Sequence, residues 1–410
     1  MSTEKNRSTA SFADSSGLAV KGFQACAIKA GIRGKDRLDM ALIYSEKPAA
    51  AAGVFTTSQV KAAPVLLGME HLKGATAQAI LVNSGVANAC SGSKGMEFAR
   101  TTASLVSMAM DTALTDVQVC STGVIGEQLD LAWFEKGVPS LVEGLQDDGF
   151  EDVAQAMMTT DTVPKVEKVS FDLGGAEVTI LGLAKGAGMI MPNMATMLSF
   201  VVTDAAIAPD VLQTMLEKAV GQSFNVITVD GDTSTNDTVL LLANGVAGHP
   251  VIDSEQSPGA QDFQAALDRL TKNLALKIVA DGEGATKLIT VRVQGAAAWK
   301  DAEQIGRTVA NSPLFKTACY GEDANWGRIF AAAGRAGVDF DQSKVDIFFD
   351  EVQMVEKGLG LFANEAAATE VLKQEDFVVT VDLHAGSESC EIYTCDFTHD
   401  YVSINGDYRS

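Results

Sequence analysis

The 410-residue sequence is poor in the residues that build disulfide frameworks and metal centres. Its six cysteines are scattered and include no C-x-x-C pair, which indicates reduced thiols rather than disulfides. Its four histidines are also far apart, and none has metal-ligand spacing with another histidine or with a cysteine. We therefore expect no metal site, and nothing in the pattern calls for a cofactor.

Long apolar runs and an excess of basic charge are missing as well. No apolar run approaches the roughly 18 residues that indicate a membrane span. Residues 1–17 lack the apolar core of a signal peptide and carry acidic residues, so we expect a short disordered leader on a cytoplasmic protein. The net charge of −22 repels phosphate backbones, which argues against nucleic acid as a partner. An anionic small substrate remains compatible, because a local lysine can reverse the potential inside a pocket.

What is present is an ordinary globular composition, 47% hydrophobic and 20% charged, in a chain long enough for two domains. Short β-rich runs alternate with helical patterns up to about residue 286, and the texture then changes. We expect an α/β fold, with α+β layers, and a second, smaller α+β domain. The expected divisions are a leader over 1–17, a main domain over 18–286, the smaller domain over 287–396 and a tail over 397–410 free to reach elsewhere.

Three local predictions can be tested directly. The run "FNVITV" (224–229) is predicted as a strand, and the apolar runs within 376–397 as a β-hairpin. Between 230 and 237, "DGDTSTND" begins like a calcium loop, but Thr235 stands where such a loop needs glycine and Leu241 where it needs an acid. We interpret it as a polar turn between two strands.

The stretch "STGVIG" (121–126) has two interpretations. Thr122 and Gly123 follow a β-rich run, and a Thr-Gly pair at a strand end can offer a hydroxyl and an exposed backbone N–H side by side. Those are the groups of an oxyanion hole. The same letters also suit a plain turn, and the residues by themselves favour the turn.

Thr196 lies within the apolar stretch "MPNMATMLSF" (191–200). Taken by itself, it is best explained as a strand residue whose hydroxyl bonds a nearby carbonyl. The alternative is a nucleophile, which needs an adjacent base. A threonine that becomes the first residue of a chain gains its own α-amine, of reference pKa about 7.7–8.0, for that purpose. The precursor would then have to cut itself between Ala195 and Thr196.

Longer blocks of sequence change the balance between these alternatives. They include "KGAGMIMPNMATMLSFVVTDA", "NSGVANACSG", "STGVIG", "MTTDTVPK", "DGDTSTNDT", "VADGEGATK", "GEDANWGRI" and "DYVSINGDYRS". With these blocks in this order, the chain closely resembles the glutamate/ornithine N-acetyltransferases of the cyclic arginine pathway, over nearly its whole length after the leader. One departure is Val86, where that family usually has asparagine; we expect it to alter a turn at most.

The resemblance implies a role for each matching position. Thr196 matches the nucleophile, Ala195–Thr196 the self-cleaved bond, and Thr122 with Gly123 the oxyanion hole. The substrate-contacting positions are Thr159, Lys185, Thr196, Glu283, Asn405 and Ser410. The family assembles from two α and two β chains, here residues 1–195 and 196–410, and the main domain would be an N-terminal-nucleophile-like, self-processing one with the tail returning to its active site.

The implied reaction moves the acetyl group of N2-acetyl-L-ornithine to L-glutamate through an acetyl-threonine intermediate. Lys185 suits a carboxylate and Glu283 an ammonium, while the end of the substrate that each one binds stays open. Acetyl-CoA as a further donor is also open. The alternatives are an N-terminal-nucleophile aminopeptidase or amidase, since related folds share this nucleophile, and a non-catalytic amino-acid-binding protein.

Overall fold

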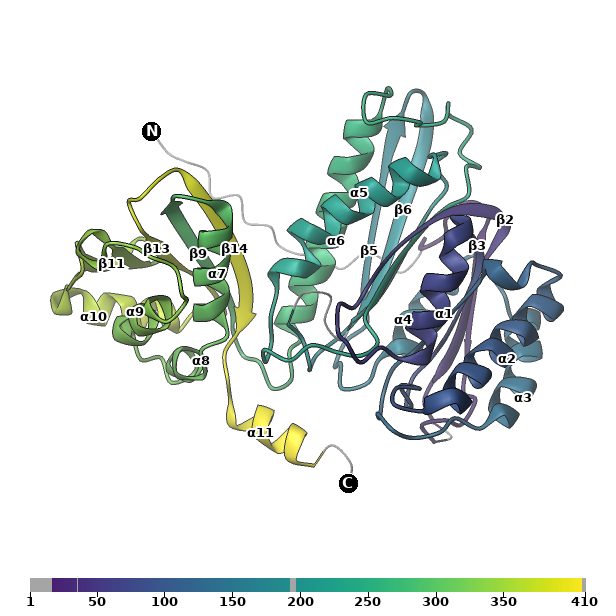
Figure 1. The fold of residues 1–410 in the computed structure, drawn as a ribbon, viewed down its shortest axis with the longest axis horizontal. Helices are drawn as coiled ribbons and strands as arrows, with labels where there is room; N and C mark the ends of the chain where they lie inside the picture. Colours follow the sequence, from purple (N-terminus) through teal and green to yellow (C-terminus); the bar gives the residue numbers. More distant parts are fainter. Residues whose placement is uncertain (1–16, 35, 192–196, 408–410) are drawn as a thin grey trace.

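The computed structural model describes residues 17–34, 36–191 and 197–407, which form two β-sheets covered by helices (Figure 1). The larger sheet has the order β4-β3-β2-β8-β7-β6-β5, with β1 paired to β2. Its strands are β1 (Phe23–Ile28), β2 (Met40–Phe55), β3 (Thr76–Asn83), β4 (Val117–Ser121), β5 (Lys165–Leu173), β6 (Ala176–Lys185), β7 (Leu198–Thr203) and β8 (Thr238–Ala243). The predicted mixed α/β class is confirmed.

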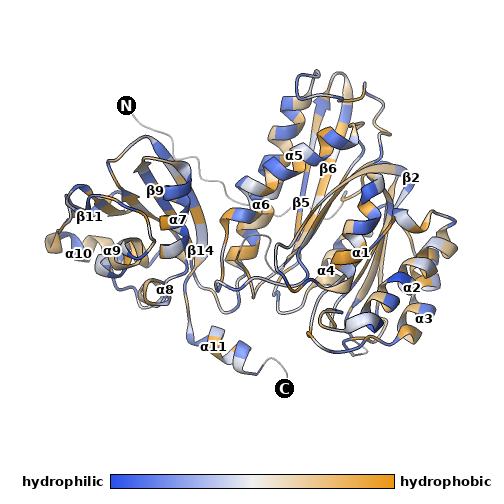
Figure 2. Ribbon diagram, in the orientation of Figure 1, coloured by the Kyte–Doolittle hydropathy of each residue, from blue (hydrophilic) through white to orange (hydrophobic). Residues whose placement is uncertain are grey.

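The central strands β7 and β8 are buried at every position. Hydrophobic residues are frequent in the strands of the larger sheet (Figure 2). Along β7, Phe200 and Val202 join one hydrophobic cluster, while Val201 joins another. This is the period of two that a strand imposes on its side chains. The helices of this region are α1 (Ala63–His71), α2 (Gly92–Met110), α3 (Leu131–Glu143), α4 (Phe150–Met157), α5 (Pro209–Gln222) and α6 (Ala260–Ala280).

The smaller sheet has the order β12-β11-β10-β13-β9-β14. Its strands are β9 (Leu288–Ala296), β10 (Asp346–Phe349), β11 (Val352–Glu356), β12 (Leu359–Gly360), β13 (Asp376–Asp382) and β14 (Glu388–Cys395). The predicted hairpin over 376–397 is therefore wrong. Strand β9 lies between its two arms, with Val291 opposite both Val379 and Ile392. The short connection between the arms only has to cross two strand spacings, about 10 Å, which a few extended residues can do.

The helices around the smaller sheet are α7 (Trp299–Ala310), α8 (Pro313–Tyr320), α9 (Trp326–Gly334) and α10 (Glu365–Leu372), and α11 (His399–Gly406) forms the tail. In the tail, α11 extends from the end of β14 and buries none of its residues (Figure 1). Within the described part of the chain, no helix is both long and apolar enough to cross a membrane.

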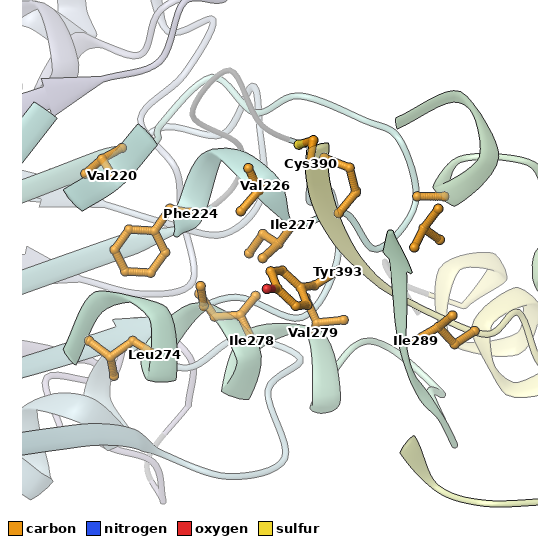
Figure 3. Packing of buried hydrophobic residues seen from close by; sticks show 14 of the residues in the cluster. Val220, Phe224, Val226, Ile227, Leu274, Ile278, Val279, Ile289, Cys390 and Tyr393 are labelled. Atoms are coloured by element: carbon orange, nitrogen blue, oxygen red, sulfur yellow. The ribbon is translucent and has the colours of Figure 1, made fainter. Parts of the chain in front are cut away.

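The junction between the two sheets is apolar and continuous (Figure 3). Phe224 and Ile227 pack there with Ile278 of α6 and Tyr393 of β14. The predicted strand 224–229 is wrong: the chain forms a 3₁₀ turn, η3 (Phe224–Val226), and then one isolated bridge from Ile227 to Tyr393. Its apolar side chains fill the junction, and its backbone does not add a strand to either sheet. The β-rich composition of this run does not distinguish these two outcomes.

Candidate active site

A cavity of about 220 Å³ lies where the ends of β4 and β6 meet the loops before β8 and after α6 and the tail helix α11. Six of the predicted site residues line it: Thr122, Gly123, Thr159, Lys185, Glu283 and Asn405. The other predicted positions, Ala195, Thr196 and Ser410, lie outside the described residues. Residues as far apart in sequence as 122 and 405 thus meet in one pocket.

The turn after β4 presents Thr122 and Gly123 to this cavity. Thr122 is buried, and its backbone N–H donates to the carbonyl of Asn83 at 3.0 Å. Gly123 has φ +131°, and a Cβ on it would lie 2.2 Å from the carbonyl carbon of Gly85. No residue with a side chain fits there without moving the neighbouring backbone. Val86, the departure from the family pattern, is buried in the adjoining segment and forms a bridge with Val124.

The loop "DGDTSTND" does more than turn the chain, which the sequence interpretation missed. Ser234, Thr235 and Asn236 line the cavity. The buried Asn236 amide donates to the carbonyls of Ala87 (2.6 Å) and Ser121 (2.8 Å), so it connects the cavity-lining segment at Ala87 to the end of β4. The signal that could have found it is the run of amide, hydroxyl and carboxyl groups between the mostly buried segment 224–229 and the fully buried strand β8.

The same loop holds both chain segments that flank residues 192–196. Asp230 accepts from the N–H of Met189 at 2.5 Å and of Ile190 at 2.9 Å. Asp237 accepts from the N–H of Met197 at 3.0 Å. Burial raises the pKa of the Asp237 carboxyl well above its ordinary value, despite this hydrogen bond and the nearby Lys185. The first described residue after the predicted nucleophile is therefore anchored by a buried acid.

Lys185, the last residue of β6, carries the buried cation of the pocket. Its Nζ lies 3.9 Å from Oδ2 of Asp161. Burial lowers the pKa of the Lys185 ammonium, and the Asp161 carboxylate opposes that shift. Burial also works against ionisation of Asp161, but Lys185 and Lys165 outweigh it and hold the pKa of this carboxyl below its usual range.

Glu283, buried in the loop after α6, supplies the anion of the pocket. Its backbone N–H donates to the carbonyl of Ala187 at 2.8 Å, and its carboxylate accepts from the Asn405 amide at 2.7 Å. A Cβ on Gly188 would lie 2.4 Å from that carboxylate, so any side chain there would displace the carboxylate from its present position. Thr398 at the start of α11 donates to the Gly284 carbonyl at 2.7 Å. The tail is thus tied to the Glu283 loop at two points.

A hydroxyl beside a backbone amide, with a buried cation and a buried carboxylate in the same small cavity, suits acyl transfer on a charged amino acid. The Thr-Gly pair can stabilise a developing oxyanion. The two opposite charges can orient a substrate that carries both a carboxylate and an ammonium.

Comparison with known proteins agrees with this class. The model of the ArgJ family matches residues 24–410. The Arginine biosynthesis bifunctional protein ArgJ of Desulfotalea psychrophila is 55% identical over 394 residues, covering 96% of this chain and 100% of that protein. Its namesake from Geobacter sulfurreducens is 53% identical, with the same coverage. The chain belongs to the ArgJ family, so the predicted acetyltransferase family and enzyme class are confirmed.

A solved relative is also similar. It is the ornithine acetyltransferase of Mycobacterium tuberculosis, whose structure is complexed with ornithine. It is 36% identical in sequence, with a TM-score of 0.38, covering 43% of this chain and 93% of that one.

Proposed function

We propose that this protein is a glutamate N-acetyltransferase that moves the acetyl group of N2-acetyl-L-ornithine to L-glutamate. The observation that carries the proposal is the convergence of Thr122, Gly123, Lys185 and Glu283 on one cavity. N2-acetylornithine carries an α-carboxylate, an amide to be cleaved and a side-chain ammonium, which these groups complement. Membership of the ArgJ family, whose named relatives act in arginine biosynthesis, supports the same substrate class.

The first step is self-cleavage. The hydroxyl of Thr196 attacks the carbonyl of Ala195, an ester replaces the amide, and water hydrolyses the ester. This leaves residues 1–195 and 196–410 as separate pieces and frees the α-amine of Thr196. That amine then serves as the base for its own hydroxyl, because its reference pKa of about 7.7–8.0 lies near the working pH.

Acetyl transfer follows in two halves. Thr196 attacks the acetyl carbonyl of N2-acetylornithine, the Thr122 hydroxyl and the Gly123 N–H stabilise the oxyanion, and ornithine leaves with the proton taken from the hydroxyl. Glutamate then attacks the acetyl-threonine ester, forming N-acetylglutamate and regenerating Thr196. This is a ping-pong cycle with a covalent intermediate.

In this proposal Lys185 binds the substrate carboxylate and Glu283 its ammonium, while Thr159, Asn405 and Ser410 complete the contacts. We also propose acetyl-CoA as a second acetyl donor, which would give the enzyme a second activity; its relatives are named bifunctional proteins. We further propose assembly in the cytoplasm from two α and two β chains. The site belongs to a main domain over 18–286, with a smaller domain over 287–396 and a tail over 397–410 that returns to the site.

Intact mass and N-terminal sequencing of the purified protein test the first step. We expect two fragments, one beginning "TMLSFVVTDA", and a single 43.0 kDa chain for Thr196→Ala. An uncut wild-type chain would remove the activated amine and favour a binding protein instead.

Acetyl transfer from N2-acetylornithine to glutamate, followed by mass spectrometry, tests the second step. We expect N-acetylglutamate and ornithine in equal amounts. A cut protein that hydrolyses peptides without transferring acetyl to glutamate would identify an aminopeptidase or amidase.

A further inference from the structure

Behind the cavity lies a chain of four charges that runs from Lys185 to the end of α6. Asp161 lies 3.9 Å from the Lys185 ammonium and 2.7 Å from that of Lys165. Lys165 in turn lies 2.6 Å from Asp281, the residue that directly follows α6. Asp161 and Lys165 are fully buried, and neither they nor Asp281 lines the cavity. We call these four side chains, Lys185, Asp161, Lys165 and Asp281, the ion-pair chain.

The ion-pair chain also holds backbone segments next to the cavity. The Asp161 carboxylate also accepts from the N–H of Gly186 (2.6 Å), next to Lys185, and of Thr159 (3.0 Å). At the other end, Asp281 accepts from the N–H of Thr162 at 3.0 Å and stands two residues before Glu283. The same four side chains therefore connect the positions of Lys185 and Thr159 to the loop that carries Glu283.

Stability alone is a weak explanation for such an arrangement. Burying ions costs desolvation, and well-packed apolar residues in place of a buried ion network are often as stable or more stable. What a network of directed, charge-assisted hydrogen bonds supplies better than an apolar core is a fixed geometry for the groups it bonds.

We propose that Asp161, Lys165 and Asp281 are positioning residues that fix the separation between Lys185 and Glu283, so that the enzyme selects acetylated diamino acids by side-chain length. The inference rests on the proposed function, in which Lys185 and Glu283 bind the two charged ends of the donor. Ornithine has three side-chain methylenes between its α-carbon and its ammonium. Lysine has one more and 2,4-diaminobutyrate one fewer, so a rigid pair of charges fits only one of the three.

The test variant is Lys165→Met/Asp281→Asn. It removes one positive and one negative charge, so the net charge is kept, and it leaves Asp161 with Lys185, Gly186 and Thr159. The matched control is Glu167→Gln/Lys277→Met, because this pair, 2.7 Å apart, also joins β5 to α6 but does not line the cavity. The measurement is kcat/KM with N2-acetyl derivatives of ornithine, lysine and 2,4-diaminobutyrate as donors and glutamate as acceptor.

We expect the preference for the ornithine donor to fall about tenfold or more in the test variant and to stay unchanged in the control, since one methylene more or less is worth about 10–200-fold even in a hydrophobic pocket. Equal losses with all three donors, or the same loss of preference in the control, would overturn the inference. If the double variant does not fold, Asp281→Asn alone replaces it, since Asp281 is partly exposed, and the same ratio decides. A wild-type enzyme that does not use the ornithine donor would contradict the proposed function instead.

Discussion

Each sheet region buries a lysine and a threonine near a strand end, and the two pairs differ in what they face. In the larger region, Lys185 and Thr122 line the cavity. In the smaller region, Lys316 donates to the hydroxyl of Thr394 at 2.7 Å and to the carbonyl of Cys395, and its ammonium lies 4.6 Å from the ring centre of Phe397. Neither Lys316 nor Thr394 lines that cavity.

The two lysines are buried for different reasons. Lys316 ends on neutral oxygens of its own region, which satisfies the charge and holds α8 to β14. Lys185 has a carboxylate behind it, at 3.9 Å, and the cavity in front. A buried lysine is therefore not by itself evidence of a functional site, whereas a buried lysine that faces an open, polar cavity is.

The largest expected effect comes from the threonine pair. Thr122→Val should lower kcat by about 10²–10³-fold with KM nearly unchanged, because the hydroxyl is needed only when the oxyanion forms. Thr394→Val is the matched control and should leave kcat unchanged while lowering stability. Steady-state kinetics on both variants make the comparison; an equal fall in kcat for the two would place Thr122 outside the chemistry.

The lysine pair should show the next largest effect. Lys185→Met should lower kcat/KM by about 10–150-fold, mainly through KM for the acetylated donor, since a hydrogen bond to a charged group contributes about 1.5–3 kcal/mol. Folding should persist because Asp161 keeps Lys165 as its partner. A variant with unchanged KM would show that Lys185 does not bind the donor.

Lys316→Met should change stability without changing kinetics. The substitution leaves the Cys395 carbonyl and the Thr394 hydroxyl without this donor, at a cost of about 1–3 kcal/mol in the free energy of unfolding. Chemical denaturation measures the loss, and kcat/KM measured below the unfolding transition should match the wild type. A kinetic defect in the folded variant would mean that the smaller region also shapes the site.

The smallest expected effect is a pH dependence. Burial lowers the pKa of Lys185, so its positive charge is lost at a lower pH than that of an ordinary lysine. KM for the acetylated donor should therefore rise as the pH increases through that lowered pKa, and Lys185→Met should abolish the rise. The measurement is KM from about pH 6 to pH 10; a wild-type KM that stays flat until the ordinary lysine range would contradict the prediction.

The two regions also differ in how well their strands and site residues could be predicted from the sequence. Most strands of the larger sheet were predictable because their apolar runs are local, and Thr122, Lys185 and Glu283 were found through family motifs. The hairpin prediction failed because β9, about 80 residues earlier in the chain, pairs with both β13 and β14. Local patterning carries no information on such a non-local insertion.

In and around the site, the missed residues are those whose role depends on several partners, most of them distant in sequence. Asp161 becomes informative only when Lys165, Lys185 and Gly186 are seen around it. Asn236 likewise bonds carbonyls more than a hundred residues distant. Polar runs such as 159–162 and 230–237 look like ordinary turns until the tertiary contacts are known.

The strand order of the larger sheet has a consequence for how the protein is made. Strands β7 and β8 lie between β2 and β6, so a cut between 195 and 196 gives two pieces that share one sheet along two separate ladders. Residues 1–195 produced alone would expose two unpaired strand edges, a surface prone to aggregation. If the proposed cleavage takes place, we therefore expect the chain to fold as one polypeptide before it is cut, and the pieces should then migrate together until a denaturant separates them.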